Sequence, residues 1–167
     1  LELLFGSLKA AEDAFRQVLD LGRFQDDQGA MAVGYGNLGN VAFKQGDLDA
    51  AVDYHNQALA LDKELGRKEG MATQYGNLGN VAFKQGDLDA AVEYYNQALA
   101  LDKELGRKEG MVLGYANLGL VAFKRGDLLE ARQFWVQARG LFAEMGAQPA
   151  VAQFDQLLAD LEPTAGP

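Results

Sequence analysis

Residues 75–99 read YGNLGNVAFKQGDLDAAVEYYNQAL, and this stretch decides the fold because it returns at a fixed spacing. Residues 35–74 recur as residues 75–114, and a looser third copy fills residues 115–154. A constant period of this size is typical of a stacked repeat array, in which no unit can bury its apolar face alone. Between the first two copies only five of 40 positions change, and they are Asp53/Glu93, His55/Tyr95, Ala72/Val112, Thr73/Leu113 and Gln74/Gly114.

The composition excludes several classes of function. Of the 167 residues, 49% are apolar, which is enough for a continuous core. The chain has no Cys and a single His, so we expect no disulfide framework, metal site, cofactor or catalytic relay, and no enzyme. No apolar run approaches the roughly 20 residues of a membrane span. The net charge of −9 argues against a nucleic-acid surface, and we expect a cytoplasmic protein.

Glycine divides each copy into two helical segments. Asp47, Asp87 and Asp127 each follow a Gly and precede an Ala- and Leu-rich run, as helix N-caps do. Apolar residues recur with a 3.6-residue period, and no segment alternates like a strand. The sequence predicts first helices, called A helices, at 29–45, 68–85 and 108–125, and second helices, called B helices, at 47–65, 87–105 and 127–145. Glycines are expected to end them, at Gly46, Gly86 and Gly126 and at Gly66, Gly106 and Gly146.

The two ends of the array are expected to differ. Ser7 lies 40 residues before Asp47, which predicts an earlier B helix that is capped by Ser7 and runs to about residue 23. Residues 1–5 are either the tail of a preceding A helix or a vector remnant. At the other end, Pro149 begins a capping helix whose apolar face is Phe154, Leu157, Leu158 and Leu161. We predict one domain, 1–162, made of a partial repeat 1–34, repeats 35–74, 75–114 and 115–148, and a capping helix 149–162, with a frayed tail at 163–167.

The repeat closely resembles the tetratricopeptide repeat (TPR). In the second copy Tyr75, Leu78 and Gly79 match the aromatic and the Leu-Gly pair of the family's first helix. The Ala, aromatic and Ala of its second helix are matched by Ala91, Tyr95 and Ala98. The period of 40 resembles the longer repeats of LGN/Pins-type polarity scaffolds and kinesin light chains. This resemblance implies an all-α fold, a right-handed α-α superhelix (TPR solenoid) of antiparallel helix pairs whose A helices line the concave surface.

The A helices carry a repeated polar stripe that we predict to bind a peptide. Residues three or four apart share one helix face, and an Asn side chain both donates and accepts hydrogen bonds. Lysines add positive charge along this face of an acidic protein, which favours an extended, acidic peptide partner and salt-sensitive binding of micromolar strength. The predicted peptide-binding residues are Asn37, Asn40, Lys44, Asn77, Asn80, Lys84, Asn117 and Lys124.

Other interpretations of these residues remain open. The asparagines and lysines are also compatible with a solvated helix face, and duplication alone makes them recur. Gly36 and Gly76 need a compensating contact, from a ligand backbone or from a neighbouring helix, because a helical Gly costs about 1 kcal/mol. His55 occupies the aromatic position of its B helix and is predicted to be a packing residue.

The lysine and arginine pattern of TPR domains that clamp chaperone tails is incomplete here, so that ligand is not expected. The alternative function is assembly. If residues 1–5 are a severed A helix, the N-terminal end exposes apolar surface that would stack on further repeats or on another copy of the chain, giving a homo-oligomer.

Overall fold

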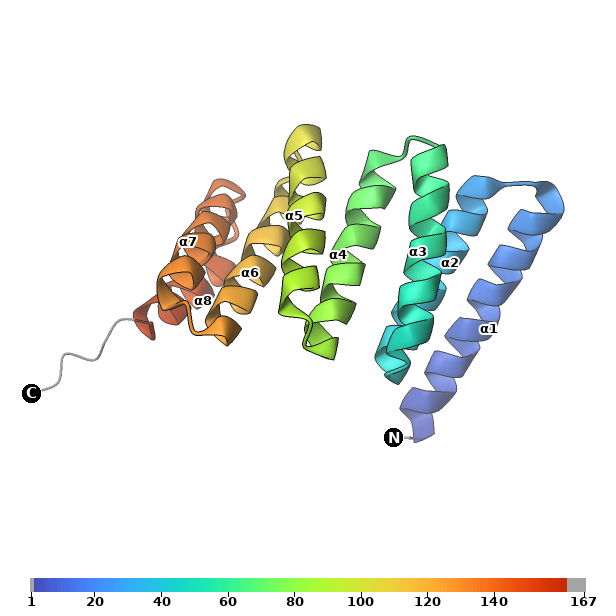
Figure 1. The fold of residues 1–167 in the computed structure, drawn as a ribbon, viewed down its shortest axis with the longest axis horizontal. Coiled ribbons are helices and arrows are strands. Elements are labelled where there is room, and N and C mark those ends of the chain that lie inside the picture. Colours follow the sequence, from blue (N-terminus) through green and yellow to red (C-terminus); the bar gives the residue numbers. More distant parts are fainter. Residues whose placement is uncertain (1, 162–167) are drawn as a thin grey trace, which may run out of the picture. The chain divides into compact units, whose positions relative to one another are not determined.

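The computed structural model describes the backbone of residues 2–161 and the side chains of residues 7–161. Within residues 2–161 the chain forms eight α-helices and no strand (Figure 1). The helices are α1 (Glu2–Gln25), α2 (Gln28–Gln45), α3 (Leu48–Glu64), α4 (Lys68–Gln85), α5 (Leu88–Leu105), α6 (Lys108–Arg125), α7 (Leu128–Glu144) and α8 (Gln148–Ala159). The predicted all-α class is confirmed, and the predicted tail at 163–167 lies outside the described residues.

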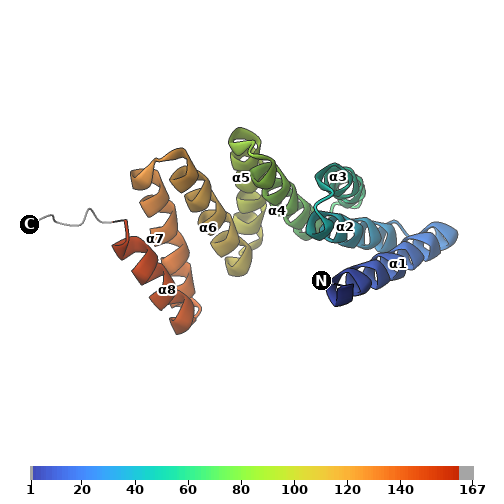
Figure 2. The same cartoon turned by 90° about the horizontal axis from the view of Figure 1, so that it is seen from below.

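The chain forms two compact units, Leu1–Tyr94 and Tyr95–Pro167. Unit 1 contains α1 to α4 and the start of α5, and unit 2 contains the remainder. Consecutive helices pack as pairs within each unit: α1 on α2, α2 on α3 and α3 on α4 in unit 1, and α6 on α7 and α7 on α8 in unit 2 (Figures 1 and 2). The single domain over 1–162 stays a prediction.

The predicted limits of α2 to α7 agree with the structure to within about one residue, because the caps of these helices form as the sequence indicates, whereas α8 ends at Ala159, three residues before the predicted end of the capping helix. The Asp47 carboxylate accepts a hydrogen bond from the backbone N–H of Ala50 at 3.1 Å, and the caps at Asp87 and Asp127 repeat this bond. Gly46 has φ of +87°, a left-handed conformation that favours glycine, and the other five terminal glycines are also left-handed. The glycine–aspartate pairs therefore end one helix and begin the next.

The prediction for the N-terminus is wrong in one respect. Ser7 does not cap a helix, because α1 begins at Glu2 and passes through Ser7 without a break. Leu, Glu and Phe around it are adequate helix formers, and one internal Gly costs only about 1 kcal/mol, so the helix continues. The question of what residues 1–5 represent stays open, and their side chains lie outside the described part.

Each unit has its own apolar core. In unit 1, Leu19, Leu38 and Ala58 from α1, α2 and α3 pack together, and a second cluster joins Ala42, Ala51 and Val81. In unit 2, Trp135 packs with Ala122 and Ala131, and α8 covers this cluster as the predicted capping helix. The α8 side that faces the cluster carries the four predicted residues, Phe154, Leu157, Leu158 and Leu161.

Close approach of the A and B helices depends on the glycine of the Leu-Gly pair. A Cβ atom on Gly39 would lie 2.6 Å from Cε1 of His55, and a Cβ on Gly119 would overlap the indole of Trp135. No real side chain tolerates such contacts, so these positions are restricted to glycine. Gly39 and Gly119 therefore have a structural role in the packing of the helix pairs.

Candidate interaction surface

The eight predicted peptide-binding residues lie on α2, α4 and α6. The three asparagines of the first stripe position, Asn37, Asn77 and Asn117, are half-buried, while Asn40, Asn80 and the three lysines are exposed. The side chains of Asn37, Asn40, Lys44 and Asn77 make no hydrogen bond or ion pair with any residue that the structure describes. Asn80, Asn117, Lys84 and Lys124 do interact within the chain. Hydrogen-bonding capacity is thus most available on α2 and at Asn77 of α4.

Lys84 connects the two A helices of unit 1. Its Nζ donates to the backbone oxygen of Phe43 at 3.3 Å and lies 4.6 Å from the centroid of the Phe43 ring. The Lys84 ammonium, which we predicted to attract an acidic ligand, is therefore partly engaged by Phe43 through a cation–π contact. Phe43 itself is half-buried against the core of unit 1.

Gln74 explains the glycine at position 36. A Cβ on Gly36 would lie 3.0 Å from Nε2 of Gln74, so the amide of α4 occupies the space that a side chain on α2 would need. A Cβ on Gly76 would meet no described atom within 4 Å. Of the two compensating contacts expected for Gly36, the neighbouring helix is the one present.

His55 and Gln74 form a buried polar pair in unit 1. The Nδ1 atom of His55 lies 3.0 Å from Oε1 of Gln74. Gln74 also opposes in part the rise that burial causes in the pKa of the Asp62 carboxyl group. Burial lowers the pKa of the His55 imidazole, with Gln74 opposing the shift, so the ring is held neutral. His55 occupies the aromatic position of its B helix and is buried, as expected of a packing residue.

Asp62 near the end of α3 and Asp102 near the end of α5 each pack against the first turn of the A helix that follows. Each carboxylate is buried and lies where a Cβ on Gly70 or Gly110 would be. Burial raises the pKa of both carboxyl groups, and the nearby arginine, whose Nε is 3.5 Å away, lowers it in part. These aspartates were not singled out from the sequence, although the Asp-x₇-Gly spacing that the first two copies share was a usable signal.

A second feature missed at the sequence level is a repeated cation–tyrosine pair. Lys63 Nζ lies 5.5 Å from the ring of Tyr75 in unit 1, and Lys103 Nζ lies 5.1 Å from Tyr115 in unit 2. The lysine comes from the last turn of a B helix and the tyrosine from the following A helix. This recurrent contact, worth about 0.5–1 kcal/mol at an exposed site, helps each B helix to pack on the A helix that follows it. It gives the tyrosine at the family's first aromatic position a structural role.

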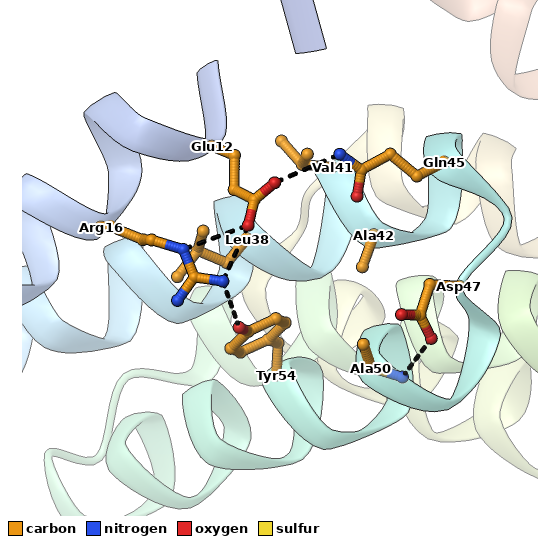
Figure 3. Close-up of a pocket in the computed structure, with 9 residues that line it drawn as sticks. All are labelled: Glu12, Arg16, Leu38, Val41, Ala42, Gln45, Asp47, Ala50 and Tyr54. Carbon is orange, nitrogen blue, oxygen red and sulfur yellow. Dashed lines mark hydrogen bonds and ion pairs between the residues drawn. The ribbon is translucent and has the colours of Figure 1, made fainter. Parts of the chain in front are cut away.

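A small cavity of about 130 Å³ opens between α1, α2 and α3 (Figure 3). Its polar groups bind one another: Arg16 Nη2 donates to Glu12 at 2.7 Å and to the Tyr54 hydroxyl at 3.3 Å, and Gln45 donates to Glu12 at 3.3 Å. The hydrogen bond from Arg16 is the main reason why the pKa of Glu12 is lowered. These bonds connect α1 to α2 and α3 at the cavity.

The part of the chain from residue 2 to 161 contains no helix long and apolar enough to cross a membrane. Among the same residues no three His, Asp or Glu side chains are grouped as a metal site would require. Neither finding assigns a function.

The structure defines an all-α repeat protein made of packed antiparallel helix pairs with duplicated caps. Two profiles described as Tetratricopeptide repeat match residues 30–104 and 77–139. The chain belongs to the tetratricopeptide-repeat family and is accordingly a protein–protein interaction or scaffold module.

Solved structures share the fold of this chain. BtubC (BKLC) from P. vanneervenii is similar with a TM-score of 0.76 and 21% identity, over 92% of this chain and 65% of that one. A putative kinesin light chain with nearly identical TPR-like repeats from Podosopora anserina gives 0.66 and 17%, over 93% of this chain and 85% of that one. At these identities the likeness concerns the fold, and the chain spans about two thirds of BtubC. No curated protein matches.

Proposed function

We propose that this TPR protein binds an extended peptide segment of a partner protein through the polar stripe of its A helices, without catalysis. The observation that carries the proposal is the state of Asn37 and Asn77, which are half-buried and have no side-chain partner among the described residues. A half-buried side-chain amide is stabilised by a partner that both donates and accepts hydrogen bonds. The backbone of an extended peptide does both.

Exposed groups around these amides suit such a ligand. Asn40 and Lys44 are exposed on the same stripe of α2 and keep their hydrogen-bonding capacity. Lys44 favours an acidic side chain or carboxylate in the ligand, whereas Lys84 is already engaged by Phe43 and contributes less. We therefore expect a moderate preference for acidic peptides, with binding that weakens as ionic strength rises.

The strength of the complex follows from the number of available bonds. Each net hydrogen bond contributes about 0.5–1.5 kcal/mol, and peptide ordering opposes association. Three amides and one ammonium cannot give a tight complex, so affinity is expected in the micromolar range. A cytoplasmic location is consistent with this role and forms part of the proposal.

The test compares two variants with matched chemistry. Asn37→Ala/Asn77→Ala removes the stripe amides without breaking an internal side-chain bond. Asn56→Ala/Asn96→Ala removes two exposed amides from the B helices and serves as the control. A library that contains acidic, neutral and basic peptides is screened against the wild type and both variants. Selective loss in the stripe variant supports the proposal, and equal peptide recovery from all three proteins rejects it.

A further inference from the structure

Two carboxylates are buried at joints where a B helix leads into the next A helix. Asp62, in the joint between α3 and α4, is 1% exposed, and Asp102, in the joint between α5 and α6, is 4% exposed (Figure 1). The first joint lies in unit 1 and the second in unit 2. The Oδ1 atom of each carboxylate has no hydrogen-bond donor within the described part of the chain. Because buried polar atoms are nearly always hydrogen-bonded, each joint contains a group that destabilises it.

A glycine on the following helix makes room for each carboxylate. A Cβ atom on Gly70 or Gly110 would overlap the carboxylate of Asp62 or Asp102. The matching pair of residues differs in the α1–α2 and α7–α8 joints, where it is Gly22 with Ala30 and Phe142 with Ala150. Asp therefore occurs together with Gly, and where the second residue is Ala the first carries no charge. The α3–α4 and α5–α6 joints share a buried ionisable group that the other two joints do not have.

An arginine in the connecting turn faces each carboxylate. Arg67 Nε lies 3.5 Å from Oδ1 of Asp62, and Arg107 Nε lies 3.5 Å from Oδ1 of Asp102. This distance is longer than the roughly 3.2 Å that limits an ordinary N–H···O hydrogen bond. Arg67 also donates from Nη1 to the backbone oxygen of Gly29 on α2 at 3.3 Å. Burial raises the pKa of both carboxyl groups, and the arginines oppose only part of the rise.

The other charged side chains near these joints are exposed. At the start of the A helices they are Lys68, Glu69, Lys108 and Glu109, and on the B helices they are residues 63–64 and 103–104. Lys108 is paired with Glu144 of α7 at 2.9 Å. On α3, His55 contacts Gln74, which opposes part of the rise in the pKa of Asp62. On α5, Tyr95 stands at the position of His55, so the α5–α6 joint is the simpler one to measure.

We propose that the α3–α4 and α5–α6 joints are acid-sensitive, and that uptake of one proton by each buried aspartate strengthens the packing of the B helix on the A helix that follows. Protonation removes the buried charge and turns one carboxyl oxygen into a donor. Because the pKa is raised in the closed joint, the closed joint takes up the proton at a higher pH than the open joint does. The closed joint is therefore most stable below the unfolded Asp pKa of about 3.9, and it loses this stability as the pH rises through the folded pKa. This behaviour requires no peptide ligand.

The test is amide hydrogen exchange of the full chain, followed by NMR from about pH 7 to about pH 5 and corrected for the intrinsic effect of pH. The Met111 N–H, which donates to the backbone oxygen of Arg107 at 3.0 Å, reports the α5–α6 joint. The Met31 N–H, which donates to Asp27 at 3.0 Å, reports the α1–α2 joint and is the internal control. Asp102→Asn removes the buried charge with little change of shape, and Asp53→Asn removes an exposed charge as the matched control. Circular dichroism verifies that the variants fold.

Protection of the Met111 amide should rise by about threefold or more as the pH falls, while that of Met31 stays constant. Asp102→Asn should abolish this response, and Asp53→Asn should keep it. Asp102→Gly/Gly110→Ala gives the joint the residues of the α1–α2 joint and should also lose the response.

Direct titration of the carboxyl carbon signals of Asp62 and Asp102 should give pKa values above the ordinary value of about 3.9. Values at or below it would overturn the inference. It would also be overturned by equal responses of Met31 and Met111, or by a response that persists in Asp102→Asn.

Discussion

His55 and Gln74 form a coupled pair that a double-mutant cycle can measure. The near-identical second copy changes both positions, to Tyr95 and Gly114, while it keeps almost everything around them. In unit 1 the imidazole and the amide share a buried hydrogen bond of 3.0 Å. In unit 2 the tyrosine is buried, and no amide faces it from position 114. We predict that His55→Tyr and Gln74→Gly are each harmful alone and compatible together.

The magnitudes follow from the contacts. His55→Tyr inserts a larger ring beside Gln74, which costs about 1–3 kcal/mol as overpacking, and it leaves the amide oxygen without its donor. Gln74→Gly costs about 1 kcal/mol in helix propensity and about 1–3 kcal/mol for the unsatisfied imidazole. Each single variant should therefore lose about 2–4 kcal/mol. The double variant reproduces the second copy and should lose only about 1 kcal/mol, an interaction energy of at least 2 kcal/mol.

The assay is urea unfolding followed by far-UV circular dichroism at about pH 8, where the imidazole is neutral in the folded and unfolded states. Trp135 is the single tryptophan and belongs to unit 2, so its fluorescence reports that unit separately. The substitutions lie in unit 1 and should change the circular dichroism transition more than the fluorescence transition. Additive losses in the double variant would refute the coupling, and so would single variants as stable as wild type.

Three further predictions rest on single sites. Gly39→Ala should destabilise the protein by about 2–4 kcal/mol because its Cβ would lie 2.6 Å from His55, whereas Gly76→Ala should stabilise it by about 1 kcal/mol because nothing described lies within 4 Å. The same change in melting temperature for both variants would contradict this. Burial lowers the pKa of His55, so the unfolded chain takes up a proton on this residue before the folded chain does. The free energy of unfolding should therefore be constant above the unfolded pKa of about 6.5 and fall below it, by up to about 1.4 kcal/mol per pH unit. Urea unfolding between about pH 7.5 and 5.5 should show this slope in wild type and not in the double variant. Asp127→Ala should cost about 1 kcal/mol, since its carboxylate caps α7 at 2.9 Å, and unchanged tryptophan-monitored melting would contradict that.

The helix limits could be predicted because their causes are local. A Gly that ends one helix and an Asp that caps the next are adjacent in the chain, and three copies give the same answer. The same pattern misled at Ser7, where Gly6-Ser7 resembled a helix boundary. The flanking helix-forming residues outweighed it, and α1 runs through both positions. A cap motif thus predicts a helix start only where the preceding residues also favour a break.

The buried polar pair could not be predicted from any one repeat. His55 and Gln74 are on different helices, and they meet only when α3 and α4 pack. The sequence did contain a signal, because two of the five differences between the near-identical copies are these two positions. Residues that duplication keeps constant carry little information, whereas residues that change together indicate a contact. The stripe asparagines stay a prediction for the converse reason.

The same comparison of copies shows that α6 has fewer polar residues than α4 at matching positions. Thr73 and Asn80 of α4 are replaced in α6 by Leu113 and Leu120, which are 64% and 42% exposed. Exposed leucines replace polar residues here without entering the core, so α6 presents a more apolar surface than α4 does. A ligand that recognises amides alone should bind a Leu120→Asn variant more tightly, because the variant adds an amide. A ligand that places an apolar side chain on α6 should bind it more weakly, by about 1–2 kcal/mol for the lost contact. Calorimetry with a peptide from the library screen separates the two, and an unchanged affinity would mean that α6 takes no part in binding.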